Sequence, residues 1–138
     1  MPIVGVSLRT IEANHSGNTN RDVKINNKAN VTDIKEMDLP GLGQKGLSVE
    51  FSFSTNYSVE DKTAAEIKMT GELLYYGTDC KDILKQWKKS QTIPDEIHVS
   101  IINTIFRRCV TRAISLSEDI QLPPPIGLPF AQLENKKE

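Results

Sequence analysis

Few side chains in this sequence have the types and spacing that catalysis or metal binding requires. Neither His15, in a turn-rich segment, nor His98, in a predicted helix, has a histidine, cysteine or carboxylate at the spacing of a metal site. Cys80 and Cys109 do not form a Cys-x-x-Cys pair, and neither has an evident activating base. The sequence therefore predicts no catalytic residues, no metal, no cofactor and no enzymatic activity, and it predicts two reduced, core-facing thiols.

Two other motifs are candidates for binding phosphate or nucleic acid. The segment GLGQKG lacks the Gly-Lys-Ser/Thr ending of a phosphate loop and leads into a predicted strand, so we interpret it as a connection. Six basic residues on the predicted helices are candidates for a basic patch: Lys85, Lys88, Lys89, Arg107, Arg108 and Arg112. However, 17 basic and 18 acidic residues leave a net charge of −1, without the field that attracts a polyanion. We interpret the patch as a solvated helix face and expect no nucleic-acid partner.

The length and composition indicate one domain with its own core. At 138 residues, 38% of them hydrophobic, the chain is long enough to fold without disulfides or metals. No apolar run approaches the roughly 20 residues that span a bilayer. The start, MPIVGVSLRT, lacks the basic residues and apolar stretch of a secretion signal. We therefore expect a cytoplasmic protein that is not inserted into a membrane.

Alternation of apolar and polar residues predicts antiparallel strands in the first half of the chain. In LSVEFSFSTNY, residues 47–57, one face carries Phe51 and Phe53 while the other carries serines. Residues 64–76, AAEIKMTGELLYY, alternate in the same way, and the polar link between the two segments predicts a hairpin.

Two earlier segments alternate more weakly, IVGVSLRTI and VKINNKANVTDI. The turn formers of HSGNTNRD separate them and predict a second hairpin. The first of these strands is expected to lie at a sheet edge.

Helical periodicity replaces alternation after Gly77. A short helix capped by Asp79 is predicted from four apolar residues at i, i+3, i+4 and i+7: Cys80, Ile83, Leu84 and Trp87. Trp87 should therefore be buried. A long helix, capped by Thr92, is predicted to start at TIPDE and run to about Leu116. Its apolar residues cover more than one stripe, which indicates contact with two surfaces, the sheet and a second one such as a partner subunit.

The last apolar segment, LPPPIGLPF at residues 122–130, should form an extended strap. Prolines fix their own backbone angle, donate no hydrogen bond and push the preceding residue into extended conformations. We expect the strap to pack across the long helix and the sheet edge, because its leucines, isoleucine and phenylalanine need a surface.

The order of these parts resembles the SecB family of export chaperones. The resemblance covers most of the chain and is carried by MTGELLYYG, TDCKDILKQW, IPDEIHVSIINTIFRRCVTRAISL and IQLPPPIGLPF, with Phe130 as the final apolar-aromatic residue. It implies a single α+β domain, in which a four-stranded antiparallel sheet packs against a short and a long C-terminal helix. We divide the domain into the sheet (1–77), the helices (78–117) and the strap with the tail (118–138).

The resemblance also implies a function and an assembly. SecB proteins hold unfolded or nascent polypeptides in apolar grooves without ATP, form dimers that extend the sheet, and pair these dimers through helices into tetramers. They dock on the SecA motor through strong acidic charge. This chain is nearly neutral, which does not favour SecA as a partner. Protein export and protection of an aggregation-prone antitoxin both remain open, and the alternative is a non-catalytic structural subunit with a fixed protein partner.

The hypothesis for the site follows from the strap. We expect three strap residues to line one wall of a client-binding groove, with four aromatic residues as their candidate neighbours. The strap residues are Ile126, Leu128 and Phe130, and the aromatic ones are Phe51, Phe53, Tyr75 and Tyr76.

Overall fold

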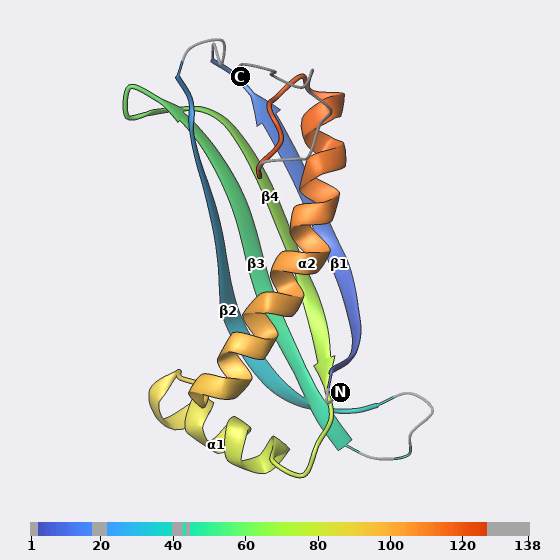
Figure 1. Cartoon of the computed structure of the whole chain (residues 1–138). Helices are drawn as coiled ribbons and strands as arrows, with labels where there is room; N and C mark the ends of the chain where they lie inside the picture. The colour runs from blue at the N-terminus through green and yellow to red at the C-terminus, as the bar shows by residue number, and fades with distance from the viewer. Residues whose placement is uncertain (1–2, 18–21, 40–42, 44, 127–138) are drawn as a thin grey trace, which may run out of the picture.

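Four strands are followed by two helices in the computed structural model, which describes residues 3–17, 22–39, 43 and 45–126. The elements are β1 (Ile3–His15), β2 (Lys24–Asp38), β3 (Lys45–Val59), β4 (Lys62–Tyr75), α1 (Cys80–Ser90) and α2 (Asp95–Asp119). The strands form one antiparallel sheet; α2 crosses one face of it obliquely, and α1 lies at one end (Figure 1). The predicted α+β architecture, a four-stranded antiparallel sheet with a short and a long C-terminal helix, is confirmed.

The strand order is β1-β4-β3-β2, so the two weakly alternating strands lie at opposite edges of the sheet. The hairpin predicted between them is wrong, because β1 pairs with β4 and β2 pairs with β3. The physical reason lies in burial. In β3 and β4 nearly every second residue is buried, and these strands take the centre, where a neighbouring strand covers each side. The expected edge position of β1 is confirmed.

The predicted hairpin between β3 and β4 is confirmed. Val59 pairs with Lys62, which leaves a loop of two residues, Glu60 and Asp61. Both have positive φ angles, 52° and 65°, and this geometry matches the right-handed twist of the flanking strands.

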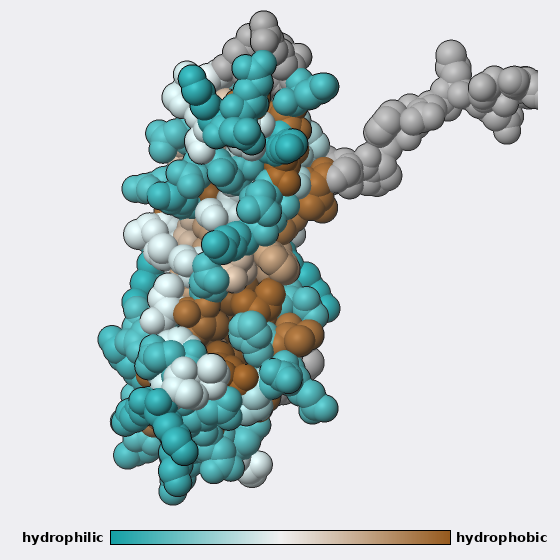
Figure 2. Space-filling model, turned by 90° about the vertical axis from the view of Figure 1, so that its left-hand side faces the viewer, coloured by the Kyte–Doolittle hydropathy of each residue, from teal (hydrophilic) through white to brown (hydrophobic). Residues whose placement is uncertain are grey.

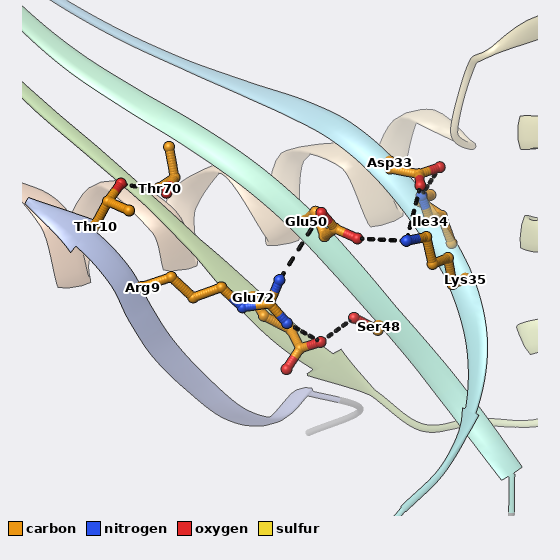
Figure 3. Close-up of polar contacts among 9 residues, drawn as sticks. All are labelled: Arg9, Thr10, Asp33, Ile34, Lys35, Ser48, Glu50, Thr70 and Glu72. Atoms are coloured by element: carbon orange, nitrogen blue, oxygen red, sulfur yellow. Dashed lines mark hydrogen bonds and ion pairs between the residues drawn. The ribbon is translucent and has the colours of Figure 1, made fainter.

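The two faces of the sheet differ sharply in polarity. On the face under α2, β3 and β4 bury ten hydrophobic residues: Leu47, Val49, Phe51, Phe53, Tyr57, Ala65, Ile67, Met69, Leu73 and Tyr75. The opposite face carries charges that pair across the strands (Figure 3). Arg9 of β1 contacts Glu72 of β4 at 2.9 Å, and Lys35 of β2 contacts Glu50 of β3 at 3.2 Å. The core therefore lies only on the helix side.

Both helices occur where the periodicity predicts them, but neither is capped by the predicted side chain. Asp79 precedes α1, yet its carboxylate accepts a hydrogen bond from the Tyr75 hydroxyl instead of capping the helix. Thr92 contacts Gln86 and Ser90 of α1, and α2 follows Pro94 without a side-chain cap. Both side chains therefore make hydrogen bonds other than those of a helix cap.

The tryptophan is buried, as predicted, and both cysteines are free thiols. Trp87 is only 7% exposed. Cys109 is a free, fully buried thiol whose pKa is raised to about 11 by burial, and Cys80 is free and half-buried. No helix in the ranges given above is long and apolar enough to cross a membrane.

Candidate functional site

Helix α2 carries two apolar stripes side by side. The first is buried against the sheet and consists of Ile101, Ile105, Cys109 and Ala113. The second is shifted by one residue and only half-buried, and it consists of Ile102, Phe106, Val110 and Ile114. Because successive helical residues are separated by about 100° around the axis, the second stripe faces sideways instead of down onto the sheet. The helix therefore has more apolar surface than the sheet covers, as its sequence predicted.

This second stripe forms one wall of a groove of about 620 Å³, which we call the apolar groove. Its lining residues are Asn27, Asn103, Phe106, Arg107, Val110, Thr111, Ile114 and Ile126. They come from β2, from α2 and from the segment after α2. Figure 2 shows the side of the molecule at the β2 edge, where hydrophobic residues gather in the middle of an otherwise hydrophilic surface. A second hollow of about 380 Å³ lies further along β2, between Val31, Trp87 and His98.

The segment after α2 is held in place by hydrogen bonds to three different elements. The Leu122 amide donates to the Ser117 carbonyl at 2.8 Å, the Tyr57 hydroxyl donates to the Pro123 carbonyl at 2.6 Å, and the Asn27 amide donates to the Pro125 carbonyl at 3.0 Å. Prolines leave these carbonyls available because they interrupt any helix or strand. Residues 122–126 therefore pack across the end of α2 and the β2–β3 edge, as expected for this part of the strap.

The strap places Ile126 at the mouth of the apolar groove. Leu122 and Pro125 are buried, whereas the Ile126 side chain is 44% exposed and lines the groove opposite Phe106 and Val110. Of the three strap residues predicted to form a wall, Ile126 thus lies at a groove. The other two, Leu128 and Phe130, lie outside the described residues.

The four aromatic residues predicted as neighbours of the strap lie deeper than expected or further away. Phe53 is 1% exposed and meets Phe106 edge-to-face, with ring centroids 6.1 Å apart and planes at 84°, so it supports the groove from beneath. Phe51 and Tyr75 are also buried in the core. Tyr76 is half-buried and follows the end of β4. Contact of these four residues with a client stays a prediction.

The groove residues on the helix were not singled out from the sequence. Phe106, Val110 and Ile114 belong to the broad apolar surface that indicated a second contact, but periodicity alone does not say which half of that surface stays open. Asn27 is a polar residue in a weak strand and gives no signal before the strap is placed.

The chemistry available in this region is that of binding. Burial raises the pKa of Tyr57 to about 12, so its hydroxyl remains a hydrogen-bond donor to the strap at neutral pH. Within the described ranges, no three histidine, cysteine or acidic side chains gather where they could hold a metal ion. The groove offers aliphatic and aromatic walls for apolar side chains, with Asn103 and Thr111 as polar groups beside them.

Replacing Tyr57 by phenylalanine should loosen the strap and alter the pH dependence of stability. The lost hydrogen bond to Pro123 should lower the free energy of unfolding by about 1–2 kcal/mol at pH 7. In the folded wild type the Tyr57 pKa is about 12, against about 10 when unfolded, so its stabilising contribution is complete below pH 10 and is lost as the pH rises through 12. Urea unfolding between pH 7 and 11.5 should therefore show the gap between the two proteins narrowing above pH 10; a constant gap would contradict this account.

The comparisons with known proteins find similarity in the fold. No protein-family model matches the sequence, and no curated protein matches it. Among solved structures, the chain is similar to the Mycobacterium tuberculosis SecB-like chaperone Rv1957 in complex with a ChAD peptide from the Rv1956 HigA1 antitoxin. The two are 11% identical, the match covers 96% of this chain and 91% of that one, and the TM-score is 0.54. The fold of this protein is therefore SecB-like.

Proposed function

We propose that this protein is an ATP-independent chaperone that binds unfolded polypeptides in the apolar groove between α2, β2 and the strap. The observation that carries the proposal is a groove of about 620 Å³ with Phe106, Val110 and Ile114 on one side and Ile126 on the other. An unfolded chain exposes apolar side chains and unpaired backbone groups, and holding it requires open apolar surface without any reactive group.

The structural neighbour supports this proposal at the level of the fold. That protein is a SecB-like chaperone in complex with an antitoxin peptide. By analogy, the clients of this chain are unfolded or nascent polypeptides in the cytoplasm, either secreted proteins or an aggregation-prone partner such as an antitoxin. The near-neutral charge does not favour docking on a SecA motor.

The direct test is suppression of aggregation in the absence of nucleotide. An unfolding model client, diluted from denaturant, should stay in solution when the protein is present in stoichiometric amounts, and added ATP should not change the yield. Unchanged aggregation at a severalfold excess of the protein would reject the chaperone and favour a structural subunit with a fixed partner.

We further propose that the chain assembles into a homodimer or homotetramer. Among the described residues of a single chain β1 pairs with β4 alone, so its other edge is unpaired, and the apolar side chain of Val4 on this edge strand is 48% exposed. An edge of this kind is a template for pairing with a second copy. Sedimentation equilibrium at micromolar concentration should therefore give two or four times the mass of one chain, 15.4 kDa. A mass of one chain would reject the assembly without testing the groove.

A further inference from the structure

The other flank of α2 carries a second groove with a different chemistry. It lies over β1, has a volume of about 560 Å³, and we call it the basic groove. Leu8 and Ile11 of β1 contribute its apolar part, and Arg107, Arg108 and Arg112 of α2 contribute its charge. All three arginines are exposed. Arg107 also lines the apolar groove, so the two grooves adjoin along the helix.

These three arginines have no carboxylate within ion-pair distance among the described residues. Residues 97–117 of α2 contain no acidic residue. On β1, Glu12 pairs in register with Lys68, on the sheet face away from the helices. The opposite face of the same sheet shows a different pattern, since its exposed cations Arg9 and Lys35 do contact glutamates (Figure 3). Within the part of the chain that the structure describes, the basic groove therefore has an unmatched positive charge beside apolar surface.

The spacing of the charges fits an extended ligand. Arg108 and Arg112 are one helical turn apart, which is a rise of about 6 Å along the axis. In an extended polypeptide, residues i and i+2 point to the same side and are about 6.6–6.8 Å apart. Two carboxylates separated by one residue can therefore reach both guanidinium groups. Without such a ligand, like charges at i and i+4 weakly destabilise the helix.

On the basis of the function proposed above, we propose that the basic groove binds an extended acidic segment of the client polypeptide. Acidic side chains at alternate positions pair with Arg108 and Arg112, and apolar side chains next to them contact Leu8 and Ile11. This chaperone thus prefers clients in which acidic residues lie beside an apolar stretch.

Two other occupants fit the groove less well. A second copy that presented its own α2 would oppose arginines with arginines, and like charges repel. Single-stranded nucleic acid is usually bound on aromatic side chains that stack with the bases, whereas the uncharged side chains lining this groove are aliphatic or hydroxylic.

The test compares three labelled unfolded peptides of equal length that share one apolar segment and carry flanking aspartates, lysines or serines. Fluorescence anisotropy at low salt should show the acidic peptide binding about tenfold more tightly than the serine peptide. The double variant Arg108→Glu/Arg112→Glu should lose this preference and favour the lysine peptide. The control variant Lys81→Glu/Lys85→Glu changes the net charge equally on exposed positions of α1 and should keep the preference.

The outcomes separate this inference from the proposed function. Binding of the serine peptide tests the apolar groove, and the difference between the acidic and serine peptides tests the arginines. Equal affinities of the three peptides, or a preference lost equally in the α1 control, would overturn the acidic-client proposal and leave the chaperone intact. A single-stranded oligonucleotide that bound more tightly than the acidic peptide, and only with both arginines present, would overturn it in favour of nucleic acid. If the acidic peptide were the only one of the three to bind, and bound only when both arginines were present, the result would support the basic groove and overturn the apolar groove.

Discussion

Placing an aspartate on either wall of the apolar groove should weaken binding of an uncharged unfolded peptide about tenfold, and placing one on both walls should weaken it about 100-fold. Val110 lies on the helix wall and Ile126 on the strap. Each substitution removes an apolar contact and forces a carboxylate to lose water when the client binds; together these effects correspond to about 1.4 kcal/mol or more per site. Anisotropy titrations with the serine peptide, for Val110→Asp, Ile126→Asp and the double variant, measure the effect.

The structure also supplies a control for these two variants. Thr104 lies on the same helix as Val110 but lines neither groove. Thr104→Asp therefore adds the same charge to α2 outside the site. Its affinity for the serine peptide should match that of the wild type. Because Ile126 is 44% exposed, Ile126→Asp should leave the thermal midpoint nearly unchanged. A strong loss of affinity in Thr104→Asp, or unchanged affinity in the double variant, would contradict the position of the groove.

The sequence predicts the elements of this fold well because each element has a periodic pattern of its own. Alternation in β3 and β4 reflects one buried face, and the i, i+3, i+4 spacing around Trp87 reflects one buried helix stripe. The periodic pattern of an edge strand does not say which other strand it pairs with. The turn-forming residues after His15 are compatible with a tight hairpin or with a connection to the far edge of the sheet. The observed strand order, in which β4 lies between β1 and β3, corresponds to the second.

The candidate site was harder to predict because aromatic type is a poor guide to exposure. Phe51 and Phe53 are large and apolar, which suits a binding wall, but such residues also fill the space between a sheet and a helix. The groove is instead lined by residues one position away from the buried stripe of α2, among them Phe106 and Val110. Which side of the helix stays open depends on where α2 crosses the sheet, and local sequence does not encode that angle.

Phe51 packs in the core against Gly71 of β4, and this contact predicts the largest effect of a single substitution on stability. Its ring lies over Gly71, at the centre of β4. A Cβ atom added to Gly71 would meet the Ser7 carbonyl oxygen of β1, the tip of the Phe51 ring at 2.8 Å and the Leu8 Cα atom at 3.1 Å. Two of these three contacts are with backbone atoms of a paired strand, which cannot rotate away as a flexible side chain can.

Gly71→Ala should therefore lower the free energy of unfolding by about 3 kcal/mol or more, by forcing β1 and Phe51 apart. Gly5→Ala is the matched control on β1, because its Cβ would meet only the Leu74 side chain at 3.8 Å, and it should cost less than about 1 kcal/mol. Urea unfolding of both variants measures the difference, and equal stabilities would show that the strands can separate without cost.

The Gly71→Ala substitution should also affect peptide binding at one groove and not at the other. Strand β1 carries Leu8 and Ile11 of the basic groove and contributes no residue to the apolar one. The folded fraction of Gly71→Ala should thus bind the serine peptide normally while losing part of its preference for the acidic peptide.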